Sequence, residues 1–492
     1  MKRRAALKHL GLGVSSLVLP GWMSGCSSEN APQPIIPYNG VVAIVGAGAA
    51  GLYAADILKS KGIKVIILEA SDRAGGRVRT LKMSDRPTES LLFTSTAPLS
   101  NDFPAELGAE LTLGTDSIWN KFVSQLNITT VDLDATSADR YLIDNVYVDH
   151  ATALNDADFV AAKNFYDNLP NYNGADVTVL QAIQAAGINP RVHDILNGWI
   201  GNNFGTNNNQ LGILPLAKTL RLLNRDKKRL LLSDNPMQDA LLSRFSTVVN
   251  EVQTNRRVKQ IDYSGDKALI TGEIPLAGGG TEPFVVEADK VIVTVPVSIL
   301  KSGDIQFTPA LPASKSTALS NIDMDASLRV LLDFKTNFWG TDSGQLFGGA
   351  NVPEYLNAGI GRSEGMKTLS LTVNGPKAAA LSDLGKDMIP QLLSELDGVF
   401  QGKATLNVRR DLNDNIISVI QDWTKEKYIR GGVSYLRPGA STDARSALSA
   451  SVAGKVFFAG EATDVTGDAG TVNGALLSAE RTADEIVALM HE

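Results

Sequence analysis

The feature that most constrains the fold is a glycine-rich turn between two apolar runs near the start of the chain. The run "VVAIV" (41–45) is continuous and β-branched, as in a strand buried on both faces. Gly46, Gly48 and Gly51 follow in the spacing G-x-G-x-x-G, and the next stretch, "LYAADILKSK", favours a helix. A second apolar run, "IKVIIL" (63–68), predicts another strand. This order predicts an α/β fold on a parallel sheet.

Each glycine of the turn has a physical role. Gly46 permits a tight turn, Gly48 lets the backbone approach a pyrophosphate, and Gly51 allows the helix to pack closely on the strand. Glu69 follows the second strand, 18 positions beyond Gly51 (69 − 51), where an acid accepts hydrogen bonds from ribose hydroxyls. A lone G-x-G-x-x-G is often incidental, but this setting predicts a Rossmann-like dinucleotide site.

A second glycine-rich turn follows Glu69 directly. It reads "ASDRAGGRVRT" and contains Gly75, Gly76 and Arg77. Two adjacent glycines let the chain pass close to a bulky ligand, and a guanidinium can donate two parallel hydrogen bonds to phosphate oxygens. The alternative is a surface loop with solvated arginines.

The two turns together resemble the FAD site of the flavin-containing amine oxidases. The resemblance implies a family that includes monoamine, polyamine and L-amino-acid oxidases and flavin-dependent histone demethylases. Related desaturases share the first motif, so it indicates FAD better than it indicates the substrate. The further segments that resemble the family are "AELGAELTLG" (105–114), "VQTNRRVKQIDYSG" (252–265), "ADKVIVTVPVSILK" (288–301), "QDWTKEKYIRGGVSYLRPG" (421–439) and "GKVFFAGEATDVTGDAGTVNGALLSAERTADEI" (454–486).

The resemblance implies which positions contact the cofactor. The implied cofactor-binding residues are Gly46, Gly48, Ala50, Gly51, Glu69, Ala70, Arg77, Gly108, Ala109, Glu110, Val258, Trp423, Gly460, Glu461, Thr471 and Val472. The helix expected to begin near Thr471 can direct its N–H groups at the flavin, or it can be a plain packing helix. No cysteine stands at the position where it could link the flavin, so we expect FAD to be bound non-covalently.

Three positions depart from the family pattern. Arg329 stands ten residues before Trp339, where the family commonly has a lysine that holds a water near the flavin. Arginine cannot be deprotonated; it can orient a water, bind a substrate carboxylate or pair with a neighbouring acid. Val433 and Thr471 occupy positions where monoamine oxidases have aromatic rings, and Tyr435 would face the same side as Val433 in a strand. Arg329 and Tyr435 are therefore the candidate residues for catalysis and for the substrate pocket.

The cofactor motifs are far apart in the chain, which predicts a discontinuous FAD-binding domain. We expect it to take residues 41–115, 245–301 and 450–492, with an α+β substrate-binding domain, partly helical, at 116–244 and 302–449. In the second domain, "SLRVLLDF" and "MKTLSLTVNG" favour strands, and "DMIPQLLSELDGVF" favours a helix. The polar stretches "LPNYNGAD" and "GNNFGTNNNQ" predict exposed loops.

The first residues are typical of an export signal. Residues 1–26 combine a basic start, paired arginines, a short apolar run and the ending "MSGC". This resembles a twin-arginine signal with a lipobox, in which Cys26 becomes lipidated, and residues 27–40 read as a polar linker. We therefore expect a bacterial lipoprotein on the periplasmic side of a membrane. The alternative is an ordinary cleaved signal with an incidental cysteine.

Composition excludes several kinds of site. Cys26 is the single cysteine, and the four histidines are scattered without ligand spacing, so we expect no metal centre. The net charge of −7 argues against a nucleic-acid partner.

The expected function is oxidation of the CH–NH bond of an amine or amino acid to an imine, with O2 reoxidising FAD to give H2O2. The membrane is expected as a partner only through the lipid anchor. Two alternatives remain: an FAD-dependent desaturase or dehydrogenase acting on a non-amine, and a flavin-binding protein with little turnover.

Overall fold

The structure, a computed structural model, describes residues 40–441 and 443–489. These described residues all belong to one compact unit. The expected signal segment, Cys26 and the linker up to residue 39 lie outside the described residues. Among the described helices, none is long and apolar enough to cross a membrane.

The predicted strand–turn–helix–strand unit forms the middle of a five-stranded sheet in which every strand pair is parallel. The strand order is β22 (Val456–Phe458), β13 (Lys290–Val293), β1 (Val41–Val45), β2 (Lys64–Leu68) and β9 (Val252–Gln253). Three distant parts of the chain therefore build one sheet. The predicted α/β class is confirmed.

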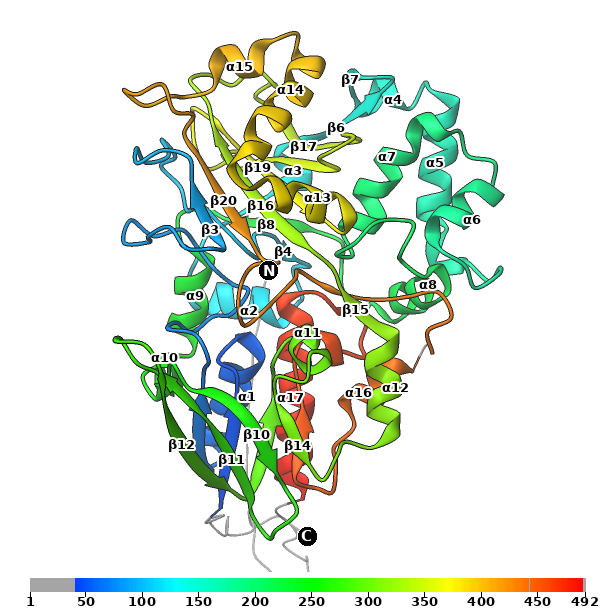
Figure 1. Cartoon of the computed structure of the whole chain (residues 1–492). Helices are drawn as coiled ribbons and strands as arrows, with labels where there is room; N and C mark the ends of the chain where they lie inside the picture. The colour runs from blue at the N-terminus through cyan, green and yellow to red at the C-terminus, as the bar shows by residue number, and fades with distance from the viewer. Residues whose placement is uncertain (1–39, 442, 490–492) are drawn as a thin grey trace, which may run out of the picture. The chain divides into compact units, whose positions relative to one another are not determined.

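Alternate residues of β1 face opposite cores, as the two-residue period of a strand requires. Val42 and Ile44 pack into one cluster with helices α1 (Ala49–Ser60) and α17 (Val472–Ala488), which lie side by side in blue and red in Figure 1. Ala43 and Val45 pack into the opposite cluster, against the four-stranded sheet. That sheet has the order β12 (Thr281–Ala288), β11 (Ala268–Pro275), β10 (Arg257–Asp262) and β14 (Gln306–Thr308).

A second, largely antiparallel sheet has eight strands and lies in the upper part of Figure 1. Its order is β3 (Leu91–Phe93), β20 (Ser418–Asp422), β16 (Ser327–Asp333), β19 (Thr368–Asn374), β18 (Glu354–Asn357), β17 (Ser343–Phe347), β6 (Ala138–Ile143) and β7 (Val146–Asp149). Strands β16 and β19 confirm the two strand predictions in this region. The predicted helix is present as α14 (Met388–Phe400), which packs on the sheet together with α13 (Pro376–Leu384).

The two faces of this sheet differ in polarity. Leu328 and Val330 on β16, like Leu371 and Val373 on β19, point into the apolar cluster beneath α13 and α14. Their neighbours in the strands therefore point to the opposite face. That face carries Arg329, and it covers the candidate site.

The helical part of the chain forms a separate cluster of apolar side chains. Its helices are α5 (Ala157–Asp167), α6 (Val179–Ala185), α7 (His193–Leu196) and α8 (Ile213–Leu222), with a π-helical turn at Asn197–Asn202. The prediction that 201–210 is an exposed loop is wrong, because Asn202, Thr206 and Asn208 are buried there. The side-chain amides and the hydroxyl of these residues form hydrogen bonds inside the fold. For example, the Asn202 side-chain nitrogen donates to the Thr372 carbonyl.

Smaller elements join these parts. They are α2 (Ile118–Gln125), α3 (Leu133–Thr136), α4 (His150–Ala153), α9 (Met237–Arg244), α10 (Ser246–Val249), α11 (Val297–Lys301), α12 (Ala313–Asn321), α15 (Lys403–Asn407), α16 (Ala444–Ser449), β4 (Thr112–Leu113), β5 (Thr130–Asp132), β8 (Arg229–Leu232), β15 (Ile322–Met324) and β21 (Ser434–Leu436). Helices α2 and α9 share the core of α1 and α17. They come from the segment assigned to the substrate-binding domain, so the exact domain boundaries stay a prediction.

The buried side chain of Glu106 predicts that the free energy of unfolding depends on pH. Burial raises the pKa of Glu106 from 4.5 to about 7, against the hydrogen bonds from the Thr80 hydroxyl and the Met237 amide. The folded state therefore holds this proton more tightly than the unfolded state, and the free energy of unfolding falls as pH rises from about 4.5 to about 7, by about 3 kcal/mol. Urea unfolding near pH 5 and near pH 8 should show this slope, and Glu106→Gln should flatten it. An equal slope in the variant would contradict the assignment.

Candidate functional site

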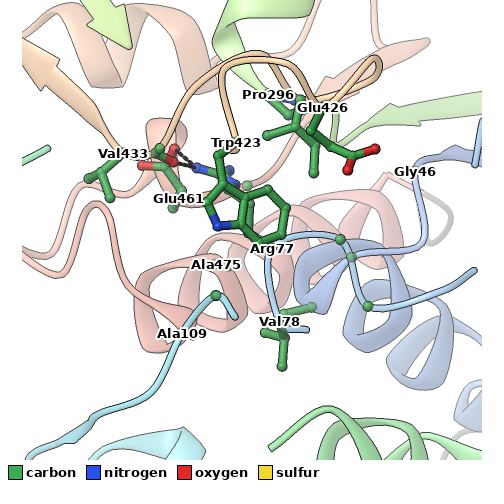
Figure 2. A pocket seen from close by; sticks show the side chains of 18 of the residues that line it. Gly46, Arg77, Val78, Ala109, Pro296, Trp423, Glu426, Val433, Glu461 and Ala475 are labelled. Carbon is green, nitrogen blue, oxygen red and sulfur yellow. Dashed lines mark hydrogen bonds and ion pairs between the residues drawn. The ribbon is translucent and has the colours of Figure 1, made fainter. Parts of the chain in front are cut away.

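One cavity, of about 370 Å³, is lined by residues from every segment that the cofactor prediction used. Figure 2 shows Gly46, Arg77 and Val78 from the first two turns, Ala109 from the following loop, and Trp423, Val433, Glu461 and Ala475 from the C-terminal part of the chain. Glu69 and Glu461 are separated by 392 positions (461 − 69) and line the same cavity. Its size is in the range of small-molecule and cofactor sites.

The first turn is built as the sequence predicted. Gly46 has φ = +111°, a conformation that favours glycine, and a Cβ added at Gly51 would lie 1.9 Å from the Gly46 carbonyl oxygen. Gly51 therefore packs the helix against the turn and does not itself line the cavity. Gly48 is the N-cap of α1, and no side chain accepts hydrogen bonds from the N–H groups of the first turn of this helix. Gly48, Ala49 and Ala50 line the cavity, so these N–H groups are available to an anionic ligand there.

Glu69 is positioned at the C-terminal end of β2. Its Oε2 accepts a hydrogen bond from the Ala47 amide (2.8 Å), and its Oε1 accepts from the Ser71 amide (2.9 Å) and hydroxyl (2.8 Å). A carboxylate has about four acceptor positions, so Glu69 keeps capacity for a further donor from the cavity.

The second turn is part of the cavity wall, so the surface-loop alternative is wrong. Gly75 and Gly76 have φ = +109° and +57°, and a Cβ at Gly76 would lie 3.4 Å from the Gly48 Cα. The two glycine turns therefore lie against each other. Arg73, in the same turn, donates to the Gly76 carbonyl through Nη2, while its Nη1 is buried and has no partner within the described residues. Burial lowers the pKa of Arg73, so an anion in the cavity would stabilise this guanidinium.

Arg77 and Glu461 both line the cavity and form a partly buried ion pair, drawn with dashed lines in Figure 2. Arg77 Nη1 lies 2.9 Å from Glu461 Oε1 and 2.7 Å from the Gly432 carbonyl oxygen. Glu461 Oε2 accepts from the Ser434 hydroxyl, which in turn accepts from Arg445. Burial acts to raise the pKa of Glu461, but Arg77 and Arg445 with Ser434 hold it below its ordinary value. Glu461 is thus kept as an anion.

The loop at 108–110 and the Trp423 indole form the wall beside the eight-stranded sheet. Trp423 Nε1 donates to the Leu107 carbonyl (2.9 Å), and a Cβ at Gly108 would lie 1.9 Å from the Arg77 carbonyl oxygen. The main chain therefore passes closely under the second turn at Gly108.

Arg329 pairs with an acid of this loop. Its Nη1 donates to Glu110 Oε2 (2.7 Å) and to the Ser370 hydroxyl (3.0 Å), and its Nη2 donates to the Gly108 carbonyl (2.9 Å). Of the three roles open for Arg329, the structure shows pairing with a neighbouring acid.

Apart from Gly51, every predicted cofactor-binding residue lines the cavity, and so do Arg329 and Val433. Tyr435 does not, so its prediction as a pocket residue is wrong. Strand β21 begins at Ser434, so Val433 is not part of it. The Tyr435 ring is buried in the apolar cluster formed by the helical part of the chain. The C-terminal helix α17 begins as predicted, with Thr471 as its N-cap, and Thr471 and Val472 line the cavity.

Several lining residues were not predicted. They are Arg73, Arg256, Arg257, Asn202, Asn203, Glu354, Thr372, Asn374 and Glu426. Arg256 and Arg257 directly precede Val258, so their charge next to an expected cofactor contact was a usable signal. Asn202 and Asn203 lie in the stretch 201–210, which was predicted to be an exposed loop, and Asn374 lies at the end of a predicted strand. Glu354 stands in a short strand that carries no motif.

The cavity fits an elongated ligand with an anionic centre. The glycines have no side chains at the place where the two turns meet, which leaves space for a ligand. Arg73 has an unpartnered donor nitrogen there, and the carboxylates of Glu69 and Glu461 are acceptors in the cavity wall. This is the donor and acceptor set that a dinucleotide with hydroxyls and a diphosphate requires.

Comparison with curated proteins gives relatives that match nearly the whole chain. Lysine-specific histone demethylase 2 of Homo sapiens is 26% identical over 94% of this chain and 56% of its own length. Lysine-specific histone demethylase 1 homolog 1 of Oryza sativa is 29% identical over 97% of this chain and 55% of its own length. The chain thus spans about half the length of the curated relatives it matches.

Solved structures share the fold. A putrescine oxidase triple mutant superposes with a TM-score of 0.72 at 20% identity, over 92% of this chain and 99% of that chain. Cyclohexylamine oxidase from Brevibacterium oxydans IH-35A superposes with a TM-score of 0.70 at 17% identity, over 92% and 100%. The sequence profile described as "Flavin containing amine oxidoreductase" matches residues 49–185 and 201–487. The chain belongs to the family of flavin-containing amine oxidoreductases.

Proposed function

We propose that this protein is an FAD-dependent oxidase that converts a primary or secondary amine to an imine. The observation that carries the proposal is the convergence of Glu69, Val258 and Glu461, from three distant segments, on one cavity that also contains the paired Arg329. Membership of a flavin-containing family supports the class of cofactor, and the two glycine turns support the dinucleotide form.

FAD would accept two electrons and a proton from the carbon bearing the amine, while the amine nitrogen loses the second proton. O2 would then take up the two electrons and two protons to give H2O2. The protein would bind the cofactor and orient it in the cavity. The first turn of α1 and Arg73 would hold the diphosphate, Glu69 and Glu461 would accept hydroxyls, and the main chain at Val258 would contact the adenine. Among the described residues that line the cavity there is no cysteine, and we propose that the cofactor is held non-covalently.

Arg329 has a positioning role in this proposal. Its three hydrogen bonds tie strand β16 to the Gly108–Glu110 loop, and a guanidinium does not lose its proton in proteins. It therefore keeps the loop in place and keeps its charge, and it does not act as a base. The imine product would be hydrolysed by water to a carbonyl compound and an amine or ammonia.

The test is reduction of the bound flavin by amines in the absence of oxygen, followed by admission of oxygen. We expect amines to bleach the flavin absorbance and oxygen to restore it with release of one H2O2 per turnover. Reduction by non-amine substrates alone would favour a desaturase or dehydrogenase, for which the non-aromatic Val433 and Thr471 are the motivating observation. Flavin that no substrate reduces would favour a binding protein.

Export is a separate proposal that rests on residues 1–26 alone. We propose a bacterial lipoprotein carried across the membrane in folded form, anchored through Cys26, and facing the periplasm. Mass spectrometry of the mature N-terminus tests it: a diacylglyceryl cysteine at position 26 is the expected result. A mature chain that begins elsewhere, without lipid, would contradict it.

A further inference from the structure

A buried ion pair lies behind one end of the cavity. Arg225 Nε lies 2.6 Å from Asp468 Oδ1, and the two side chains are 10% and 5% exposed. Neither residue lines the cavity. Arg225 belongs to the segment that follows helix α8, and Asp468 stands three residues before Thr471, the N-cap of α17 (471 − 468). Among the described residues, Arg225 is the only cation that forms an ion pair with Asp468.

Asp468 is fixed against the first turn of α17. Its Oδ2 accepts a hydrogen bond from the Asn473 side-chain amide (2.8 Å), and its main-chain carbonyl accepts from the Thr471 hydroxyl (2.7 Å). The same hydroxyl accepts from the Gly474 amide (2.9 Å), and a Cβ at Gly474 would lie 2.2 Å from the Asp468 carbonyl oxygen. These contacts hold the carboxylate in one position relative to the N-terminal end of the helix.

The charge of Asp468 is close to the cavity. Gly470 lines the cavity, and the two residues from Asp468 to Gly470 span at most about 7 Å. Asp464 is the second buried acid of this loop, and its Oδ2 accepts from the Asp468 amide (2.8 Å). Burial raises the pKa of Asp464, and the charge of Asp468 adds to that rise. Water screens charges only weakly in such a buried region, so the Asp468 carboxylate acts on its surroundings over several ångströms.

One end of the cavity remains for the flavin ring. The diphosphate would lie at the glycine turns with Arg73, and the adenosine would lie at Glu69 and Val258, so the end lined by Thr471 and Val472 is left for the ring. A ring that accepts two electrons and one proton gains one negative charge. This charge would develop against the N-terminal end of α17, where the main-chain amides carry a partial positive charge.

An unpaired Asp468 would oppose this stabilisation. Its carboxylate would place a second negative charge behind the same helix end, where burial strengthens the repulsion. Arg225 cancels that charge in direct contact, and water cannot replace it as a counter-charge because both side chains are nearly buried. The pair therefore leaves the positive end of the helix dipole as the field that acts on this end of the cavity.

We propose that Arg225 is a positioning residue for the flavin: it neutralises Asp468 and thereby keeps the N-terminal end of α17 favourable for the negative charge of the reduced ring. Arg225 itself does not touch the cofactor. The inference rests on the proposed FAD site and deepens it, because it assigns the reduction potential of the bound flavin to an ion pair outside the cavity.

Arg225→Met removes the charge and keeps most of the length of the side chain. The bound flavin is reduced stepwise without any amine, and its two-electron potential is read against a dye of known potential. We expect the variant to bind reduced FAD about 10-fold more weakly relative to oxidised FAD, which lowers the potential by roughly 30 mV. Fluorescence titration gives the Kd of oxidised FAD independently.

A double variant separates the charge of Arg225 from its packing. Arg225→Met combined with Asp468→Asn removes both charges, and we expect the potential to return to that of the unchanged protein. Asp468→Asn alone should raise the potential, because Arg225 then has no counter-charge. Arg225→Lys keeps the charge and should keep the potential. A merely structural role would leave the double variant displaced at least as far as Arg225→Met.

Lys228→Met is the matched control. Lys228 lies in the same segment as Arg225 and pairs with Asp132, but the two side chains are 45% and 30% exposed and neither residue lines the cavity. Exposed charges of this kind are screened by water and salt. This change should therefore leave the flavin potential unchanged.

The outcomes separate this inference from the function on which it rests. An unchanged potential in Arg225→Met, or a double variant whose potential stays as low as that of Arg225→Met, would overturn the role of Arg225. If Arg225→Met does not bind flavin, Asp468→Asn alone decides, and an unchanged or lowered potential in that variant would overturn it. No amine is used, so a failure of amine oxidation leaves this result standing. A chain that binds no FAD would overturn the proposed function itself.

Discussion

Gly48→Leu is expected to abolish stable flavin binding and leave the protein folded. Gly48 has φ = −77°, which any residue can adopt, and a Cβ built there meets no protein atom within 4 Å. The new side chain would extend into the cavity at the place where the two glycine turns meet. If a diphosphate lies there, the affinity for FAD should fall about 100-fold or more, measured by fluorescence titration of the apoprotein.

The matched control is Gly398→Leu, an exposed glycine inside helix α14 whose Cβ also meets nothing within 4 Å. This change should leave flavin affinity unchanged and should add up to about 1 kcal/mol of stability, because glycine is a poor helix former. If Gly48→Leu bound FAD as tightly as Gly398→Leu, the diphosphate could not lie against the first turn. Loss of the folded state in Gly48→Leu would contradict the open space seen at this position.

Arg77→Met is expected to destabilise the apoprotein by about 3 kcal/mol, because it removes the ion-pair partner of a buried carboxylate. Glu461 is 5% exposed and Arg77 is 28% exposed, so Glu461 would keep a buried charge with only Arg445 and Ser434 to stabilise it. The change in the free energy of unfolding is measured by chemical denaturation of the flavin-free protein, where no ligand contributes to stability.

Lys82→Met provides the comparison for an exposed pair. Lys82 and Asp239 are 44% and 51% exposed and their nitrogen and oxygen lie 3.0 Å apart. Such surface pairs contribute about 0–1 kcal/mol. If Arg77→Met were no more destabilising than Lys82→Met, the Arg77–Glu461 pair would not stabilise the fold.

The sequence alone was sufficient to predict which segments meet at the two glycine turns, because that part of the cavity depends on main-chain geometry. Gly46 and Gly51 are required by a positive φ and by a close approach, and both requirements are visible as glycine spacing. The parallel strands follow from continuous β-branched runs, and Glu69 follows from its place at the end of one of them. The structure brings these residues together as predicted.

The part of the cavity beside the eight-stranded sheet could not be predicted in the same way. Its residues meet through strand pairing across β16, β19 and β18, and no spacing within the chain reveals that Glu354 lies two strands from Arg329. The Tyr435 prediction failed because it assumed a strand that already included Val433. The stretch at 201–210 was predicted to be exposed because it is polar. In the structure the Gly201 amide donates to Asn208 Oδ1, and the Asn208 amide donates to Asn197 Oδ1.

A titration of the folded, flavin-free chain with FAD, followed by denaturation and analysis of the released flavin, tests whether the cavity holds FAD without a covalent bond. We expect that one FAD binds per chain, that the flavin spectrum shifts on binding, and that denaturation releases all of the flavin intact. A folded chain that binds no FAD, or that keeps its flavin attached after denaturation, would contradict the assignment of this cavity to a non-covalently held FAD.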